Sequence, residues 1–136
     1  IISRAMKEQV SEFVFKNTKE IANYLTFRSG FLSKEELRIL YLNSRNRLIE
    51  DEVISKGTIN ETAIYVREIA QKALNKNACA IILSHNHPSG DYSPSREDIK
   101  ITYNLKQALE ILGIQLQDHI IVSEGNFFSF RIKGLL

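Results

Sequence analysis

Several features that would mark other classes of protein are absent from this 136-residue sequence. Cys79 is the single cysteine, so no disulfide can form within the chain, and its place in an apolar run predicts a buried thiol. No stretch is apolar for long enough to cross a bilayer, and residues 1–16 lack the segments of a secretory signal. These absences predict a soluble, cytoplasmic protein with no membrane partner.

A block of basic residues is also missing. The 18 Lys and Arg residues are interspersed with 16 Asp and Glu residues, which leaves a net charge of +2. Such a distribution gives little support to nucleic-acid binding through bulk charge. The chain starts at Ile1 instead of a methionine, so we expect it to be a fragment of a longer protein.

Capping residues and apolar spacing divide the chain into helices and strands. Residues 78–83 are apolar without alternation, which predicts a central strand covered on both faces. Before the central strand, we expect a helix over 18–27, strands over 37–42 and 47–55 joined by a turn at 43–46, and a helix from a cap at Asn60 to Asn75. After it, we expect a helix that is capped by Ser93, has Pro94 at its first position and ends at Gly113. The chain then forms a hairpin of strands 116–122 and 127–131.

This order of elements predicts an α/β or α+β domain, with a mixed β-sheet and flanking helices. The 43% hydrophobic content is enough for one substantial core. We expect residues 1–28 to form a helical lead-in that remains from the longer protein, and residues 29–136 to form the main domain. In sheets of this kind functional side chains gather at strand ends, so the end of the central strand is the place to look for chemistry.

Two of the three histidines, His85 and His87, occupy alternate positions at that strand end. On an extended backbone, residues two apart project from the same face, so both imidazoles aim at one point. Asp98 continues the inward stripe of the following helix, which includes Ile101 and Leu105, so its carboxylate points toward the sheet. Two imidazoles and one carboxylate make a three-ligand zinc site with one position left for water.

Other interpretations exist for the same residues. Ser95 and Asp98 fit a capping box, and His87 before Pro88 fits a loop histidine, but their joint spacing favours a metal site. An iron site of oxygenases uses the same ligand types, although alternating strands and long helices do not suit those enzymes. A zinc nucleoside deaminase needs a Cys-x-x-Cys pair, which a single cysteine excludes.

The spacing His85-x-His87, seven residues, Ser95, two residues, Asp98 is similar to the JAMM (MPN+) metalloprotease motif. The surrounding sequence resembles the bacterial RadC family from about Thr18 onward. The resemblance is carried by Ser-His-Asn-His-Pro-Ser-Gly at 84–90, Gly57 with Thr58, Arg-Glu-Ile at 67–69, and Asp-His-Ile-Ile-Val at 118–122.

This resemblance implies a JAB/MPN-like fold with a cytidine-deaminase-like architecture. It assigns His85, His87 and Asp98 to a Zn²⁺ ion and implies a zinc-dependent hydrolase, a metallopeptidase or isopeptidase that acts on an unidentified peptide or isopeptide substrate. The alternative that it leaves open is a DNA-associated RadC-type repair accessory or binding module, with DNA contacted through the longer protein and a zinc site that is not a peptidase.

The family also uses a glutamate to activate water and a serine to hydrogen-bond the oxyanion. Ser95 takes the second role, and Glu35 and Glu36 compete for the first. We favour Glu36 because it directly precedes the expected strand at Leu37, although a shift of one residue would reverse its direction. His119 lies in an expected strand, where a lone histidine is more often structural, so it is left out of the ligand set.

Overall fold

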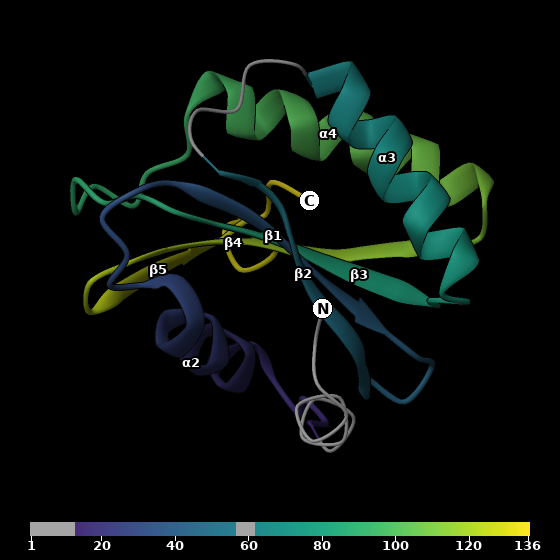
Figure 1. The fold of residues 1–136 in the computed structure, drawn as a ribbon, viewed down its shortest axis with the longest axis horizontal. Coiled ribbons are helices and arrows are strands. Elements are labelled where there is room, and N and C mark those ends of the chain that lie inside the picture. The colour runs from purple at the N-terminus through teal and green to yellow at the C-terminus, as the bar shows by residue number, and fades with distance from the viewer. Residues whose placement is uncertain (1–12, 57–61) are drawn as a thin grey trace.

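The computed structural model describes residues 13–56 and 62–136. Within these residues the chain forms one mixed β-sheet with helices on both faces, which confirms the expected α+β class (Figure 1). In chain order the elements are α2 (Thr18–Ser29), β1 (Glu36–Leu42), β2 (Leu48–Lys56), α3 (Thr62–Asn75), β3 (Ala80–Asn86), α4 (Arg96–Ile111), β4 (Gln115–Ser123) and β5 (Asn126–Ser129).

Strand β3 is the centre of the sheet, as its unbroken apolar sequence predicted. The strand order is β2-β1-β3-β4-β5, and every residue of β3 is buried. Strand β1 pairs with β3 antiparallel, whereas β4 pairs with it parallel after the crossover through α4. Because β1 and β3 run in opposite directions, the start of β1 lies beside the end of β3, where Leu37 pairs with His85.

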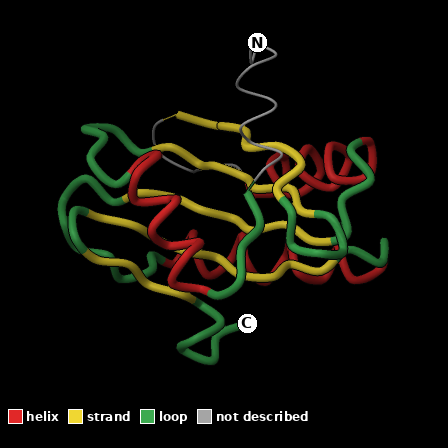
Figure 2. The backbone as a smooth tube through the Cα atoms, turned by 90° about the horizontal axis from the view of Figure 1, so that it is seen from below, coloured by secondary structure: helices red, strands yellow, loops and turns green. Residues whose placement is uncertain are grey.

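The two faces of the sheet carry separate layers. Helices α3 and α4 cover one face and α2 covers the other, as the two perpendicular views show (Figures 1 and 2). Alternation along each strand sorts the side chains between these layers. The α3/α4 face buries Leu37 and Ile39 of β1 with Leu83 of β3, whereas the α2 face buries Leu40 and Ile82.

A β-bulge in β4 changes which face its residues point to. Ile81 pairs with Leu116, but the next residue, Ile82, pairs with Asp118, so Gln117 has no partner in β3. Because side chains alternate, one extra residue puts Leu116 and His119 on the same face. His119 therefore faces α4.

Helix ends follow the sequence signals with two exceptions. Asn17 caps α2 by accepting the Glu20 N–H at 2.9 Å, and the helix continues two residues beyond its expected end at 27. The cap of α4 is Ser95, not Ser93, because the Ser95 hydroxyl oxygen accepts the Asp98 N–H at 3.0 Å. The prediction of Ser93 was therefore wrong, since two serines close together both resembled a cap.

Some of the predicted buried positions are exposed instead. The spacing of Ile101 and Leu105 also predicts an inward position for Leu112, but Leu112 is 40% exposed and the stripe runs through Leu109. Cys79 is exposed because β3 starts one residue after it, so the prediction of a buried thiol was wrong. The predicted cap at Asn60 lies outside the described residues. In the part of the chain that is described, none of the helices has both the length and the apolar character needed to span a membrane.

Candidate metal centre

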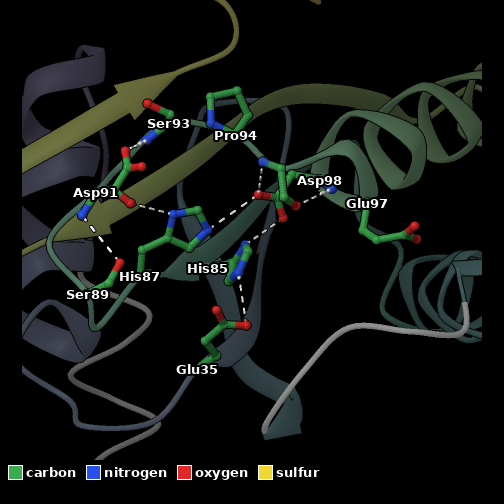
Figure 3. Close-up of a pocket in the computed structure, with 10 residues that line it drawn as sticks. Glu35, His85, His87, Ser89, Asp91, Ser93, Pro94, Glu97 and Asp98 are labelled. Atoms are coloured by element: carbon green, nitrogen blue, oxygen red, sulfur yellow. Dashed lines mark hydrogen bonds and ion pairs between the residues drawn. The ribbon is translucent and has the colours of Figure 1, made fainter.

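The sequence-predicted ligands meet where β3 ends, β1 begins and α4 starts. A pocket of about 460 Å³ opens there, and Figure 3 shows its side chains converging from these three segments. Those that concern the chemistry are Glu35, His85, His87, Ser95 and Asp98. The antiparallel pairing of β1 with β3 is what brings Glu35 within reach of residues fifty positions away.

Asp98 connects the two histidines. Its Oδ1 lies 2.9 Å from His85 Nδ1, and its Oδ2 lies 3.3 Å from His87 Nε2. The carboxylate is buried because Asp98 continues the inward stripe of α4, as its spacing predicted. Burial alone would raise the pKa of Asp98, but the contacts with His85 and His87 outweigh it and hold that pKa well below its usual range. Asp98 is therefore ionised and able to act as a ligand.

His87 lies one residue beyond β3 and is fixed from both sides. Its N–H donates to the Val122 carbonyl at 2.9 Å, and its ring Nδ1 lies 2.7 Å from the Asp91 carbonyl. A carbonyl only accepts, so Nδ1 carries the proton and Nε2 faces Asp98. The contact with Asp98 raises the pKa of His87, although burial by itself would lower it. His87 thus presents its Nε2 to the pocket.

The structure places Glu35, and not Glu36, at the histidines. Glu35 Oε2 lies 3.5 Å from His85 Nε2, and the side chain lines the pocket (Figure 3). Glu36 points to the opposite side of the sheet, where its carboxylate lies 3.4 Å from Arg38. The choice of Glu36 is corrected by the alternation along β1: Glu35 shares a face with Leu37, which pairs with His85, and Glu36 does not.

The side chain of Asn86, which lies between the two histidines, is hydrogen-bonded to the backbone on both sides of Glu35. Its side-chain oxygen accepts the Glu36 N–H at 2.7 Å, and its side-chain nitrogen donates to the Lys34 carbonyl at 2.9 Å. These two bonds imitate a strand pairing and extend the contact of β1 with β3 beyond the last paired residues. The role of Asn86 is one that sequence reasoning missed.

Ser95 has two separate relations to the pocket. Its Oγ accepts the Asp98 N–H, and the Asp98 carboxylate accepts the Ser95 N–H at 2.7 Å, which completes a capping box. An accepting hydroxyl oxygen still has its own hydrogen to donate. Ser95 therefore positions Asp98 and retains an O–H donor at an exposed place on the pocket wall.

His119 also lies at the centre, although sequence reasoning excluded it. It is completely buried, its ring is stacked on Phe130 with centroids 4.6 Å apart, and its Nδ1 lies 2.5 Å from the Thr102 hydroxyl. Burial lowers its pKa to about 3, so the ring is neutral. The only signal that could have placed it here is the bulge at Gln117, which depends on pairing with β3.

The donor set fits a metal ion. Both ring nitrogens of His85 and Oδ1 of Asp98 are buried without a hydrogen-bond partner in the described part of the chain, because the 2.9 Å contact between them is not aligned as a hydrogen bond. Buried polar atoms left in this condition are destabilising unless something binds them. A cation satisfies nitrogen lone pairs and a carboxylate together. Gly57 and Thr58, which also carried the family resemblance, lie outside the described residues.

Comparison with known proteins gives consistent results. Residues 15–135 match the family described as "RadC-like JAB domain". The UPF0758 protein YeeS of Escherichia coli (strain K12) is 44% identical over 122 residues, which cover 90% of this chain and 82% of YeeS. The UPF0758 protein YkfG of the same strain is 40% identical over 135 residues, which cover 98% of this chain and 85% of YkfG.

Some relatives are considerably longer than this chain. The UPF0758 protein PSHAa2643 of Pseudoalteromonas translucida is 42% identical over 134 residues, which cover 98% of this chain but 60% of that protein. The chain thus spans less than two thirds of the length of that curated relative. The described pocket falls within the matched region in every one of these comparisons.

Proposed function

The chain belongs to the RadC-like JAB domain family, and on that premise we propose that it is a zinc-dependent hydrolase that cleaves peptide or isopeptide bonds. The observation that carries the proposal is one pocket that holds buried, hydrogen-bond-deficient His85 and Asp98 with the Glu35 carboxylate facing them. A metal site beside a free carboxylate is the arrangement that metal-assisted hydrolysis requires.

His85, His87 and Asp98 would hold the ion, with Asp98 kept ionised by its contacts and by the positive end of the α4 dipole. When bound, zinc supplies Lewis acidity, which acidifies water and polarises a carbonyl oxygen. The backbone bond from Ser95 to Asp98 and the contact of His87 with Asp91 fix the ligands before any metal binds. Such preorganisation favours binding because little side-chain freedom is lost.

Glu35 is the group that moves the proton. Its carboxylate accepts a proton from the attacking water as the water oxygen bonds to the substrate carbonyl carbon. It then delivers this proton to the amine nitrogen as the carbon–nitrogen bond breaks. Glu35 suits this task because its side chain is partly exposed and lies 3.5 Å from His85, with no ion pair to Lys or Arg in the described part of the chain.

Ser95 stabilises the charge that develops on the carbonyl oxygen. Its hydroxyl hydrogen is free to be donated because the oxygen is occupied as an acceptor from the Asp98 N–H. A fixed donor at a developing oxyanion is worth more in the transition state than in the ground state. Because the Ser95 oxygen accepts the Asp98 N–H in the helix cap, the side chain of Ser95 is held in place for this role.

The test measures zinc content together with cleavage of peptide, isopeptide-linked and nucleic-acid libraries. Glu35→Gln removes the base, so we expect turnover to fall by about 100- to 10,000-fold while zinc content is unchanged. Glu36→Gln is the matched control, one residue away on the other face, and retains turnover.

Three outcomes contradict the proposal in different ways. Full turnover in Glu35→Gln together with loss of turnover in Glu36→Gln would show that Glu36 is the base. Cleavage that survives complete chelation of zinc would exclude a metal-dependent reaction. Salt-dependent DNA binding that persists without zinc, with no cleavage of any library, would instead favour a DNA-associated module.

A further inference from the structure

The metal centre contains two groups of ligand-type atoms that share His85. Atoms of Glu35, His85 and His87 lie within 4.8 Å of one another, and so do atoms of His85, Asp98 and His119. Zinc bonds of about 2.0–2.2 Å place neighbouring ligand atoms roughly 3–4 Å apart, so small side-chain movements complete either group. The second group is deeper, since its three residues are at most 3% exposed.

Thr102 determines which nitrogen of His119 faces this inner group. The Thr102 hydroxyl lies 2.6 Å from the Asp98 backbone carbonyl, which can only accept, so the hydroxyl donates its single hydrogen there. The same hydroxyl oxygen must then accept from His119 Nδ1–H at 2.5 Å. Neutral His119 thus has a lone pair on Nε2, and that buried atom has no hydrogen-bond partner in the described part of the chain.

His85 presents a different nitrogen to each group. Its Nε2 lies 3.5 Å from Glu35 Oε2, on the pocket side, whereas its Nδ1 lies 2.9 Å from Asp98 Oδ1, on the side of His119. A neutral imidazole has one N–H and one lone pair. His85 can therefore serve only one group at a time, and its other ring nitrogen then lies near the carboxylate of the other group.

We propose that the centre has an inner metal position, formed by His85 Nδ1, Asp98 and His119 Nε2. A single divalent transition-metal ion occupies it in alternation with the pocket position described above, where His85 Nε2, His87 and Asp98 hold the ion. The inner position rests on the proposed function because both use the same ion. An ion at the inner position binds the edge of the His85 ring that faces Asp98, whereas Glu35 faces the other edge. The inner position is thus a resting form of the centre.

The direct test uses the NMR-active isotope of cadmium as the probe, bound to protein with isotope-labelled histidine. A through-bond coupling between the ion and a nitrogen arises only from a coordinate bond. We expect one bound cadmium ion per chain, with coupling to His119 Nε2 and His85 Nδ1 in the absence of substrate. Coupling confined to His85 Nε2 and His87 would overturn the inner position.

Two variants test the same point by affinity. His119→Asn keeps a side-chain N–H donor for Thr102 but has no atom in the place of Nε2, so coupling to residue 119 is lost while one ion still binds at the pocket position. His87→Ala removes the pocket ligand, and the inner position keeps zinc with its Kd raised by no more than about 10- to 100-fold. Combining both substitutions abolishes binding.

These results separate the two proposals. If the wild-type chain binds no divalent metal, the proposed function fails and the inner position fails with it. If the wild-type chain binds zinc and His87→Ala loses it entirely, only the inner position is overturned. Should His119→Asn not fold, the wild-type cadmium coupling and the His87→Ala affinity still decide the question.

Discussion

Two aspartates on opposite sides of the sheet, Asp51 and Asp98, are both buried but have very different surroundings. On the α2 face, Asp51 accepts from the Arg38 guanidinium with one oxygen and from the Tyr24 hydroxyl with the other. On the α3/α4 face, Asp98 accepts from the Ser95 N–H with one oxygen, and its other oxygen has no hydrogen bond.

The difference is between a carboxylate whose two oxygens are both hydrogen-bonded and one that is bonded at a single oxygen. Both oxygens of Asp51 are bonded within the protein, and its partners join β2 to β1 and α2. Asp98 is held in place by a single backbone bond and faces the two histidines of the pocket. A buried carboxylate with all its hydrogen bonds stabilises a fold, whereas one left incomplete beside other donors is a binding position. Substitutions on the two faces should therefore have opposite consequences.

The largest effect on stability is expected from Asp51→Asn. The substitution leaves the Arg38 guanidinium, with 11% side-chain exposure, without its closest partner. Removing one member of a buried pair costs about 3–5 kcal/mol, and the low end applies because Glu36 remains nearby. Urea denaturation of the zinc-free protein measures this change. Zinc affinity of the folded fraction should be unchanged, and a selective loss of zinc binding would contradict the comparison.

Asp98→Asn should show the reverse pattern. The amide oxygen can still accept from the Ser95 N–H, so the free energy of unfolding without zinc falls by only about 1–2 kcal/mol. The anionic ligand is lost, so zinc affinity falls by at least about 100-fold, or roughly 2.7 kcal/mol. Competition with a chromophoric chelator measures the affinity. If Asp98→Asn destabilised the fold as much as Asp51→Asn, the two carboxylates would be equivalent.

His119 gives the α3/α4 face a specific pH dependence. Its folded pKa of about 3 is below the 6.5 of the ordinary group, so the unfolded chain binds more protons between these values. Stability is therefore lost as pH falls from 6.5 toward 3, by about 1.4 kcal/mol for each pH unit. Between about pH 6.5 and about pH 5, zinc-free wild type should lose up to roughly 2 kcal/mol more than His119→Asn.

The matched variant is needed for this measurement because His87 titrates in the same range. The raised pKa of His87 acts in the opposite direction, but it does so in both proteins and cancels in the difference. Urea denaturation at the two pH values provides the data. Parallel pH profiles for wild type and His119→Asn would show that His119 is not held neutral by burial.

The smallest effects are expected at two helix caps, one on each face. Asn17→Ala and Ser95→Ala each remove a side-chain acceptor from the first turn of a helix and should cost about 1 kcal/mol. Only Ser95→Ala should also weaken zinc binding, by several-fold, because the first turn of α4 carries Asp98. Calorimetric zinc titrations measure the zinc affinity of the two variants. Equal affinities would contradict the expectation that only the cap of α4 supports zinc binding.

The sequence was sufficient where short-range periodicity controls the outcome. Side chains two residues apart in a strand point the same way, and the apolar stripe of α4 faces inward. These two regularities predicted that His85, His87 and Asp98 converge, and the structure brings the three side chains together. The central position of β3 likewise followed from its unbroken apolar residues. In each case the residues that decide the direction of a side chain lie within one strand or one helix.

Sequence was insufficient where the direction of a side chain depends on a single residue or on a neighbouring strand. Moving the expected start of β1 by one residue exchanges Glu35 for Glu36, because consecutive residues face opposite ways. His119 faces the centre only because Gln117 has no partner in β3. No pattern within 115–123 reveals that bulge, since it is a property of two paired strands. The positions of Glu35 and His119 at the centre therefore both depend on the pairing of strands that are distant in the sequence.

The side chain of Asn86 has a consequence for protein design. Copying a His-x-His pair onto the end of another strand would transfer two ligands and leave the position of a base to chance. In this chain the residue between the histidines points to the opposite side and clamps the segment around Lys34 and Glu36. A design that copies the tripeptide from His85 to His87 should therefore also copy the partner segment 34–36, because the Asn86 bonds to that segment set the position of Glu35.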